Sequence, residues 1–159
     1  MKTNSIEQQL VRVKTTDLID ASLDWAVCLV RGLKPEDIKL QDFGPKLGYS
    51  LYRNLRDADG QLNGRYQTGP DLLFSRNWVA GGPLFEKEID NFERRGGYFY
   101  THRFKRRHDS VDSNFKTLPG DREAWAHGPT LLSSGMRCYV LSQLGEYVDI
   151  PQCLLPSKS

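Results

Sequence analysis

The chain has 159 residues, of which 38% are hydrophobic and 26% are charged. This composition is typical of one globular domain and excludes a disordered, collagen-like or coiled-coil chain. The 22 Lys and Arg residues nearly balance the 20 Asp and Glu residues, and the net charge of +2 does not by itself predict a polyanionic partner. No apolar run approaches the ~20 residues that a membrane-spanning helix needs, so we expect no membrane partner.

The chain contains three cysteines, Cys28, Cys138 and Cys153. Their odd number and the lack of C-x-x-C spacing argue against a disulfide framework and against a structural zinc site. We therefore expect no metal and no cofactor, and a reducing compartment such as the cytoplasm.

The first predicted element is a helix over residues 13–32. Thr15, Thr16 and Asp17 carry side-chain oxygens that can cap the start of a helix. Gly32 can adopt the left-handed conformation that ends one. Apolar residues at spacings of three and four indicate a core-facing stripe, and its members are Leu18, Ala21, Trp25, Cys28 and Leu29.

A β-hairpin is predicted over residues 49–67, because Asp59-Gly60 is a strong turn signal between alternating segments. Further along the chain, Gly81-Gly82-Pro83 indicates a tight turn. The run over residues 84–89 is then either a short strand or the start of a helix.

The last predicted helix begins at Pro129, which suits the first helical position, and ends at Gly145. Its apolar stripe consists of Leu132, Met136, Tyr139, Val140 and Leu144. A short strand over residues 147–150 follows it.

Together these elements predict an α+β fold, with two main amphipathic helices near the termini and a small antiparallel sheet between them. We expect a single globular domain over residues 13–151. The expected tails are residues 1–12 and 152–159.

One face of the last helix carries polar residues that suit an anion. Thr130, Ser134 and Arg137 are four and three residues apart and therefore share that face. The face begins at the helix N-terminus, where free amides and the helix dipole favour negative charge, and His127 lies just before it. The alternative is structural: small residues at 133–135 allow close packing, and Arg137 pairs with a carboxylate.

The segment around residues 76–88 is a second candidate for ligand contact. Trp78 can stack on a flat ligand, and Gly81 and Gly82 let the backbone approach it closely. Glu86 and Glu88 fall on one face of a strand, but paired glutamates are usually solvated, and we predict no catalytic residue. The predicted ligand-binding residues are Arg76, Trp78, Gly81, Gly82, His127, Thr130, Ser134 and Arg137.

The segment over residues 94–108 contains basic and aromatic residues and no acidic residue. As a strand it places Tyr98, Tyr100, His102 and Phe104 on one face and Arg103, Lys105 and Arg107 on the other. Stacking on aromatic rings with phosphate neutralisation is the chemistry of single-stranded nucleic-acid binding, and the residues proposed for it are Tyr98, Tyr100, Arg103, Lys105 and Arg107. The alternative is an ordinary amphipathic strand whose cations face water or neighbouring acids.

Three blocks of the chain carry a family resemblance. They are Thr16-Asp17-Leu18 with Leu23-Asp24-Trp25-Ala26-Val27, then Trp78-Val79-Ala80-Gly81-Gly82-Pro83-Leu84-Phe85-Glu86, and then Gly128-Pro129-Thr130 with Met136-Arg137-Cys138-Tyr139-Val140 and Leu144-Gly145. In this order the blocks resemble the NinX-like family of bacteriophage and prophage proteins, a domain of unknown function. The resemblance implies phage origin and action in the cytoplasm of a bacterial host, but no particular activity.

The sequence thus predicts a phage accessory protein that binds a small anionic, nucleotide-like ligand without catalysis. Two alternatives remain open: single-stranded nucleic-acid binding through residues 94–108, and a protein-binding antagonist of a host factor. The sequence leaves the oligomeric state open.

Overall fold

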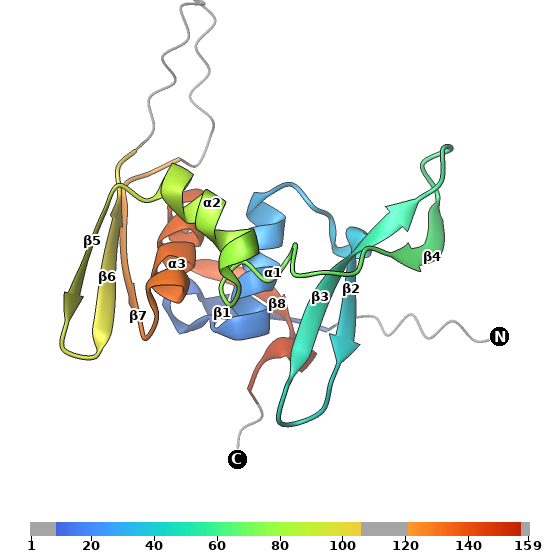
Figure 1. Cartoon of the computed structure of the whole chain (residues 1–159), viewed down its shortest axis with the longest axis horizontal. Helices are drawn as coiled ribbons and strands as arrows, with labels where there is room; N and C mark the ends of the chain where they lie inside the picture. Colours follow the sequence, from blue (N-terminus) through green and yellow to red (C-terminus); the bar gives the residue numbers. More distant parts are fainter. Residues whose placement is uncertain (1–8, 106–120, 157–159) are drawn as a thin grey trace, which may run out of the picture.

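In the computed structural model (Figure 1), which describes residues 9–105 and 121–156, three α-helices and eight strands are formed by the described residues. The helices are α1 (Asp20–Val30), α2 (Trp78–Glu88) and α3 (Leu131–Leu144). The strands are β1 (Leu10–Lys14), β2 (Ile38–Asp42), β3 (Tyr49–Arg56), β4 (Leu62–Tyr66), β5 (Asn91–Arg95), β6 (Tyr98–Arg103), β7 (Ala124–Gly128) and β8 (Tyr147–Pro151). Three short 3₁₀ turns are η1 (Thr15–Asp17), η2 (Pro35–Asp37) and η3 (Gln152–Leu154).

The strands form three antiparallel sheets with the orders β1-β8, β2-β3-β4 and β5-β6-β7. Figure 1 shows the sheets β5-β6-β7 and β2-β3-β4 at opposite ends of the molecule, with the helices between them. The described helices are too short or too polar to cross a lipid bilayer.

The predicted arrangement of two terminal helices around one small sheet is wrong. In the described part of the chain, the first element in the sequence is the strand β1, and the last are its partner β8 and the turn η3. The strands divide into three sheets. Local periodicity could not show this, because the pairing of Val13 with Val148 joins residues far apart in the sequence. Residues of both expected tails belong to the folded domain, because β1 begins at Leu10 and Leu154 of η3 is buried.

The predicted first helix begins later than expected, at Asp20. The preceding residues continue β1 into η1, and the hydroxyl of Thr15 donates to the carbonyl oxygen of Gly145 at 2.6 Å instead of capping a helix. The predicted stripe still faces the core, since Ala21, Trp25 and Cys28 are buried.

Helix α3 lies at the centre of the fold and contacts α1, α2, β6 and β7. Small residues bring it close to its neighbours, as a Cβ atom added at Gly135 would lie 2.3 Å from the Phe85 ring. On the β6 side, the Oγ1 atom of Thr101 donates to the Ser134 carbonyl oxygen at 2.9 Å. Close packing along this face fixes where both ends of α3 lie.

The Gly81-Gly82-Pro83 segment is not a turn, because it lies inside α2. Asn77 caps the helix by accepting a hydrogen bond from the Val79 amide at 2.8 Å. Pro83 lacks an amide hydrogen, but it is exposed, so water can satisfy the carbonyl that it leaves unpaired. Gly81 is required by packing, since a Cβ atom there would lie 2.0 Å from the Phe74 carbonyl oxygen.

Neighbouring glycines of α2 therefore respond differently to alanine. We expect Gly81→Ala to lower the free energy of unfolding by about 3 kcal/mol, because the helix must move away from Phe74. Gly82→Ala is the matched control: its Cβ meets only the Trp78 ring at 3.2 Å, and the gain in helix propensity is about 1 kcal/mol. Urea denaturation of both variants measures the difference, and equal stabilities would contradict the packing described for α2.

Candidate functional site

Two surface hollows meet at Arg76 and form a two-lobed cleft. The larger lobe, of about 630 Å³, lies between the start of α1, the loop over residues 44–48 and the segment over 153–156. The smaller lobe, of about 430 Å³, lies between the starts of α2 and α3. Ile19, Asp20 and Arg76 line both lobes.

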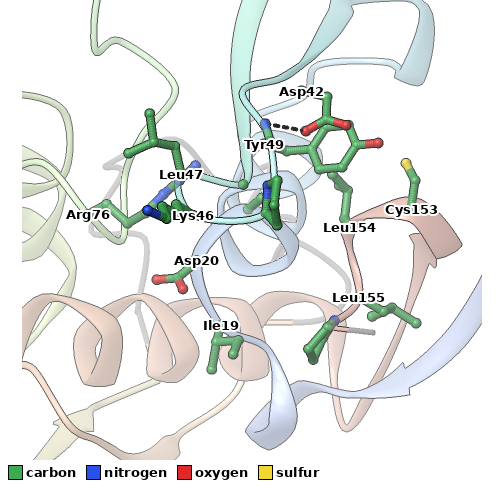
Figure 2. A pocket seen from close by; sticks show the side chains of 15 residues that line it. Ile19, Asp20, Asp42, Lys46, Leu47, Tyr49, Arg76, Cys153, Leu154 and Leu155 are labelled. Atoms are coloured by element: carbon green, nitrogen blue, oxygen red, sulfur yellow. Dashed lines mark hydrogen bonds between the residues drawn. The ribbon is translucent and has the colours of Figure 1, made fainter. Parts of the chain in front are cut away.

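The larger lobe carries charges of both signs. Figure 2 shows Lys46 and Arg76 on one side of it, and Asp42, Tyr49 and Cys153 on the other. The carboxylate of Asp42 accepts a hydrogen bond from the Gly44 amide at 2.8 Å, which fixes the start of the loop. The two cations of this lobe are therefore on the side that adjoins the smaller lobe.

A buried carboxylate holds Arg76 in place. Asp24 of α1 is fully buried and accepts hydrogen bonds from the Ser75 amide at 2.7 Å, the Ser75 hydroxyl at 2.6 Å and Arg76 Nε at 2.8 Å. The Arg76 side chain remains about one-quarter exposed, at 23%. Its Nη2 atom is buried and has no hydrogen-bond partner among the described residues. The guanidinium is thus fixed through Nε, and the exposed part of the side chain lines the cleft.

Burial raises the pKa of Asp24 from 3.8 to about 6, although the charge of Arg76 and the hydrogen bonds from Ser75 favour ionisation. At neutral pH the carboxylate is ionised and pairs with Arg76. Below about pH 6 it gains a proton, and the attraction that positions the guanidinium is lost.

Asp20 lies between the two lobes in an unusual backbone conformation. Its φ angle of 46° is the single positive value among the described non-glycine residues. The left-handed region costs a non-glycine residue about 1–2 kcal/mol, and such residues concentrate at functional sites. The exposed Asp20 carboxylate is therefore placed at the wall of the cleft at an energetic cost.

The smaller lobe combines an exposed ring with a helix N-terminus. The Trp78 side chain is 54% exposed and makes an edge-on contact with Phe85 at 5.9 Å. Across the lobe, Thr130 caps α3 by accepting from the Ser133 amide at 3.1 Å. The partial positive charge of the α3 N-terminus therefore lies at the same hollow as the Arg76 guanidinium.

Of the predicted ligand-binding residues, the structure brings Arg76, Trp78 and Thr130 together at the smaller lobe. Gly82 adjoins the Trp78 ring within α2. His127 lies elsewhere, on β7, where it stacks on Tyr100 with ring centroids 5.8 Å apart.

The other three predicted residues, Gly81, Ser134 and Arg137, lie in the packed interior. Arg137 donates from Nε to the Leu18 carbonyl oxygen at 2.7 Å and from Nη1 to that of His127 at 2.9 Å, and burial lowers its pKa. Ser134 is fully buried against β6 and β7, and Gly81 packs on Phe74. The alternative interpretation, in which this helix face serves close packing, describes them better, except that Arg137 binds backbone carbonyls instead of a carboxylate.

Sequence reasoning missed Asp20, Asp24 and Lys46. An available signal was Asp24, an acidic residue inside the apolar run over residues 21–30, where a buried charge requires a partner. No sequence signal predicts that Lys46 lies near Arg76, because the loop that carries Lys46 reaches the cleft through tertiary structure alone.

The basic-aromatic segment also differs from expectation at one residue. Arg103 is buried and pairs with Glu88 at 2.9 Å and Asp121 at 2.6 Å. Burial alone lowers its pKa, but the two carboxylates outweigh burial and the net direction is upward. Arg103 is therefore occupied within the protein and unavailable to a nucleic acid.

The other four predicted nucleic-acid contacts have different positions. Tyr98, Tyr100 and Lys105 are exposed. Arg107 lies outside the described residues.

Comparisons with protein-family models and with curated proteins found no match. The resemblance to NinX-like proteins therefore stays a prediction. Within residues 9–105 and 121–156, no group of three or more His, Cys, Asp or Glu side chains has the arrangement of a metal site.

The pKa of Asp24 predicts a pH dependence of stability. Because folding raises this pKa, the folded state binds the proton more tightly, and the contribution of Asp24 to stability falls as the pH rises from about 4 to about 6. The fall amounts to about 3 kcal/mol at ~1.4 kcal/mol per tenfold change in proton affinity. Urea denaturation of wild type and Asp24→Asn measures it: the stability of wild type relative to the variant should decrease across this range. A difference that rises or stays constant with pH would contradict the assignment.

Proposed function

We propose that the chain is a binding protein for a small anionic ligand that carries a flat ring, such as a nucleotide. The observation that carries this proposal is the Arg76 guanidinium at the junction of the two lobes, held by a buried carboxylate and with one donor unused. Guanidinium groups bind phosphate and carboxylate oxygens strongly because their donors are planar and always charged.

The smaller lobe supports a ligand with both a charge and a ring. Its volume of about 430 Å³ lies within the range of ~300–1,000 Å³ that is usual for small-molecule pockets. Trp78 offers an exposed ring for stacking, and Arg76 and the α3 N-terminus supply positive charge. The larger lobe adds Lys46 on the side shared with Arg76.

The acidic residue that lines both lobes limits the kinds of ligand that the cleft can bind. Asp20 lines both lobes beside Arg76, so a ligand made only of anionic oxygens would meet repulsion there. A ligand with a hydroxyl or amino donor close to its anionic group would instead donate to the Asp20 carboxylate. Nucleotides, whose phosphates are joined to a ribose with free hydroxyl groups, fit this pattern better than inorganic phosphate does.

The cellular setting of this proposal rests on the family resemblance. NinX-like proteins are phage and prophage proteins, and we propose accordingly that the chain acts in the cytoplasm of a bacterial host. Capture of a host nucleotide is consistent with a small protein that has a charged cleft.

Isothermal titration with mono-, di- and cyclic nucleotides tests the proposed function. We expect at least one of them to bind, and Trp78→Ala to weaken it about tenfold by removing the stacking surface. Trp125→Ala is the matched control, because this ring is similarly exposed, at 62% against 54%, but lies on β7 away from the cleft. No heat of binding across the panel, or equal losses in both variants, would contradict the proposal.

A further inference from the structure

The outward side of the sheet β5-β6-β7 presents a second binding surface. Alternation along the strands directs Thr101, Arg103, Ala124 and Ala126 inward, and all four are buried. Figure 1 shows α3 on one side of this sheet, with no described helix or strand on the other. We call the outward side the aromatic face, and its residues are Asn91, Glu93, Arg95, Tyr98, Tyr100, His102, Trp125 and His127.

The rings of the aromatic face lie against one another across the strands. His102 and Trp125 are stacked with centroids 4.5 Å apart and an interplanar angle of 6°. Tyr100 and His127 are stacked at 5.8 Å and 29°. The large rings remain open to solvent, with exposed fractions of 39% for Tyr100 and 62% for Trp125. The face therefore offers a row of flat, partly exposed ring surfaces.

A shallow hollow of about 230 Å³ adjoins these rings. It is lined by Tyr100, His102 and Trp125, together with Asn91 and Glu93 of β5. Aromatic walls beside an amide and a carboxylate suit an unpaired base, which needs a ring to stack on and polar groups at its edge.

The composition of the aromatic face suits stacked bases. Its described residues are aromatic or polar, and none is aliphatic. Protein–protein interfaces are also rich in Tyr, Trp and Arg, but their cores are depleted in charged residues, whereas this face carries the Glu93–Arg95 ion pair. A platform of rings and polar groups instead matches the chemistry of stacked bases.

Positive charge flanks the rings at both ends of β6. At the β5–β6 turn, the Arg95 guanidinium lies 5.5 Å from the centre of the Tyr100 ring. At the other end, the exposed Lys105 follows the strand. Arg95 also pairs with Glu93, so its charge is partly compensated within the face. These cations are placed to neutralise phosphates on either side of bases stacked at the centre.

We propose that the aromatic face binds single-stranded nucleic acid, with bases stacked on Tyr100 and Trp125 and phosphates held by Arg95 and Lys105. A duplex binds poorly here, because its bases are stacked on one another and their faces are unavailable to the rings. This surface is separate from the cleft at Arg76, so either proposal can fail without the other.

Fluorescence anisotropy with labelled single-stranded DNA and RNA of the same mixed sequence, about 12 nucleotides long, tests this proposal at low salt. We expect Trp125→Ala to weaken binding to at least one of them about tenfold or more. The matched control is Tyr147→Ala, which removes an exposed ring on β8, outside both the cleft and the aromatic face, and should leave this affinity unchanged. Affinity should also fall as salt rises, because each neutralised phosphate releases counterions.

Several outcomes would overturn the proposal. These are the absence of binding by the wild-type protein at low salt, equal affinity for the matching duplex, and equal losses in the Trp125→Ala and Tyr147→Ala variants. Sedimentation of the protein alone tests whether the aromatic face instead binds a second copy of the chain. Self-association that Trp125→Ala abolishes would assign the aromatic face to a protein interface instead.

Discussion

The close packing of α3 against its neighbours determines what the rest of the molecule can present. Ser134 and Gly135 allow this helix to approach β6, β7 and α2 so closely that a Cβ atom at Gly135 would clash with the Phe85 ring. Arg137 then spans from α3 to the Leu18 and His127 carbonyl oxygens. The consequence is twofold: the α3 N-terminus lies at the Arg76 cleft, and the rings of β6 and β7 are left on the outward side of their sheet.

The same packing explains why Ser134 and Arg137, on the polar face of α3, are buried and not exposed to a ligand. Hydroxyl and guanidinium groups suit an anion, but they suit backbone carbonyl oxygens equally well, and α3 uses them for the second purpose. The anion site that we propose lies instead at Arg76, outside the helices. There a fully buried carboxylate, Asp24, fixes the cation through Nε, and the exposed part of the Arg76 side chain lines the cleft. The buried pair costs desolvation, which the raised pKa of Asp24 records.

Local signals in the sequence predicted the elements that depend on local interactions. The hairpin β3-β4, the span of α3 and the strand β8 all follow from turn residues, caps and periodicity within a few positions. The prediction failed where a distant partner decides the conformation. Gly81-Gly82-Pro83 forms helix because Gly81 packs on Phe74, and residues 10–14 form a strand because β8 pairs with them. Periodicity separates apolar from polar residues, but it cannot distinguish an exposed arginine from a buried one, and so Arg76 and Arg137 had the same expected role.

Nuclear magnetic resonance of the indole N–H groups tests most directly whether the Arg76 cleft is a ligand site. The chain has three tryptophans, and each occupies a different environment: Trp25 in the core, Trp78 at the cleft and Trp125 on the aromatic face. On titration with a nucleotide, the account predicts a saturable shift of the Trp78 indole signal while that of Trp25 stays in place. A Trp78 signal that does not move at millimolar nucleotide, or a shift confined to Trp125, would contradict it.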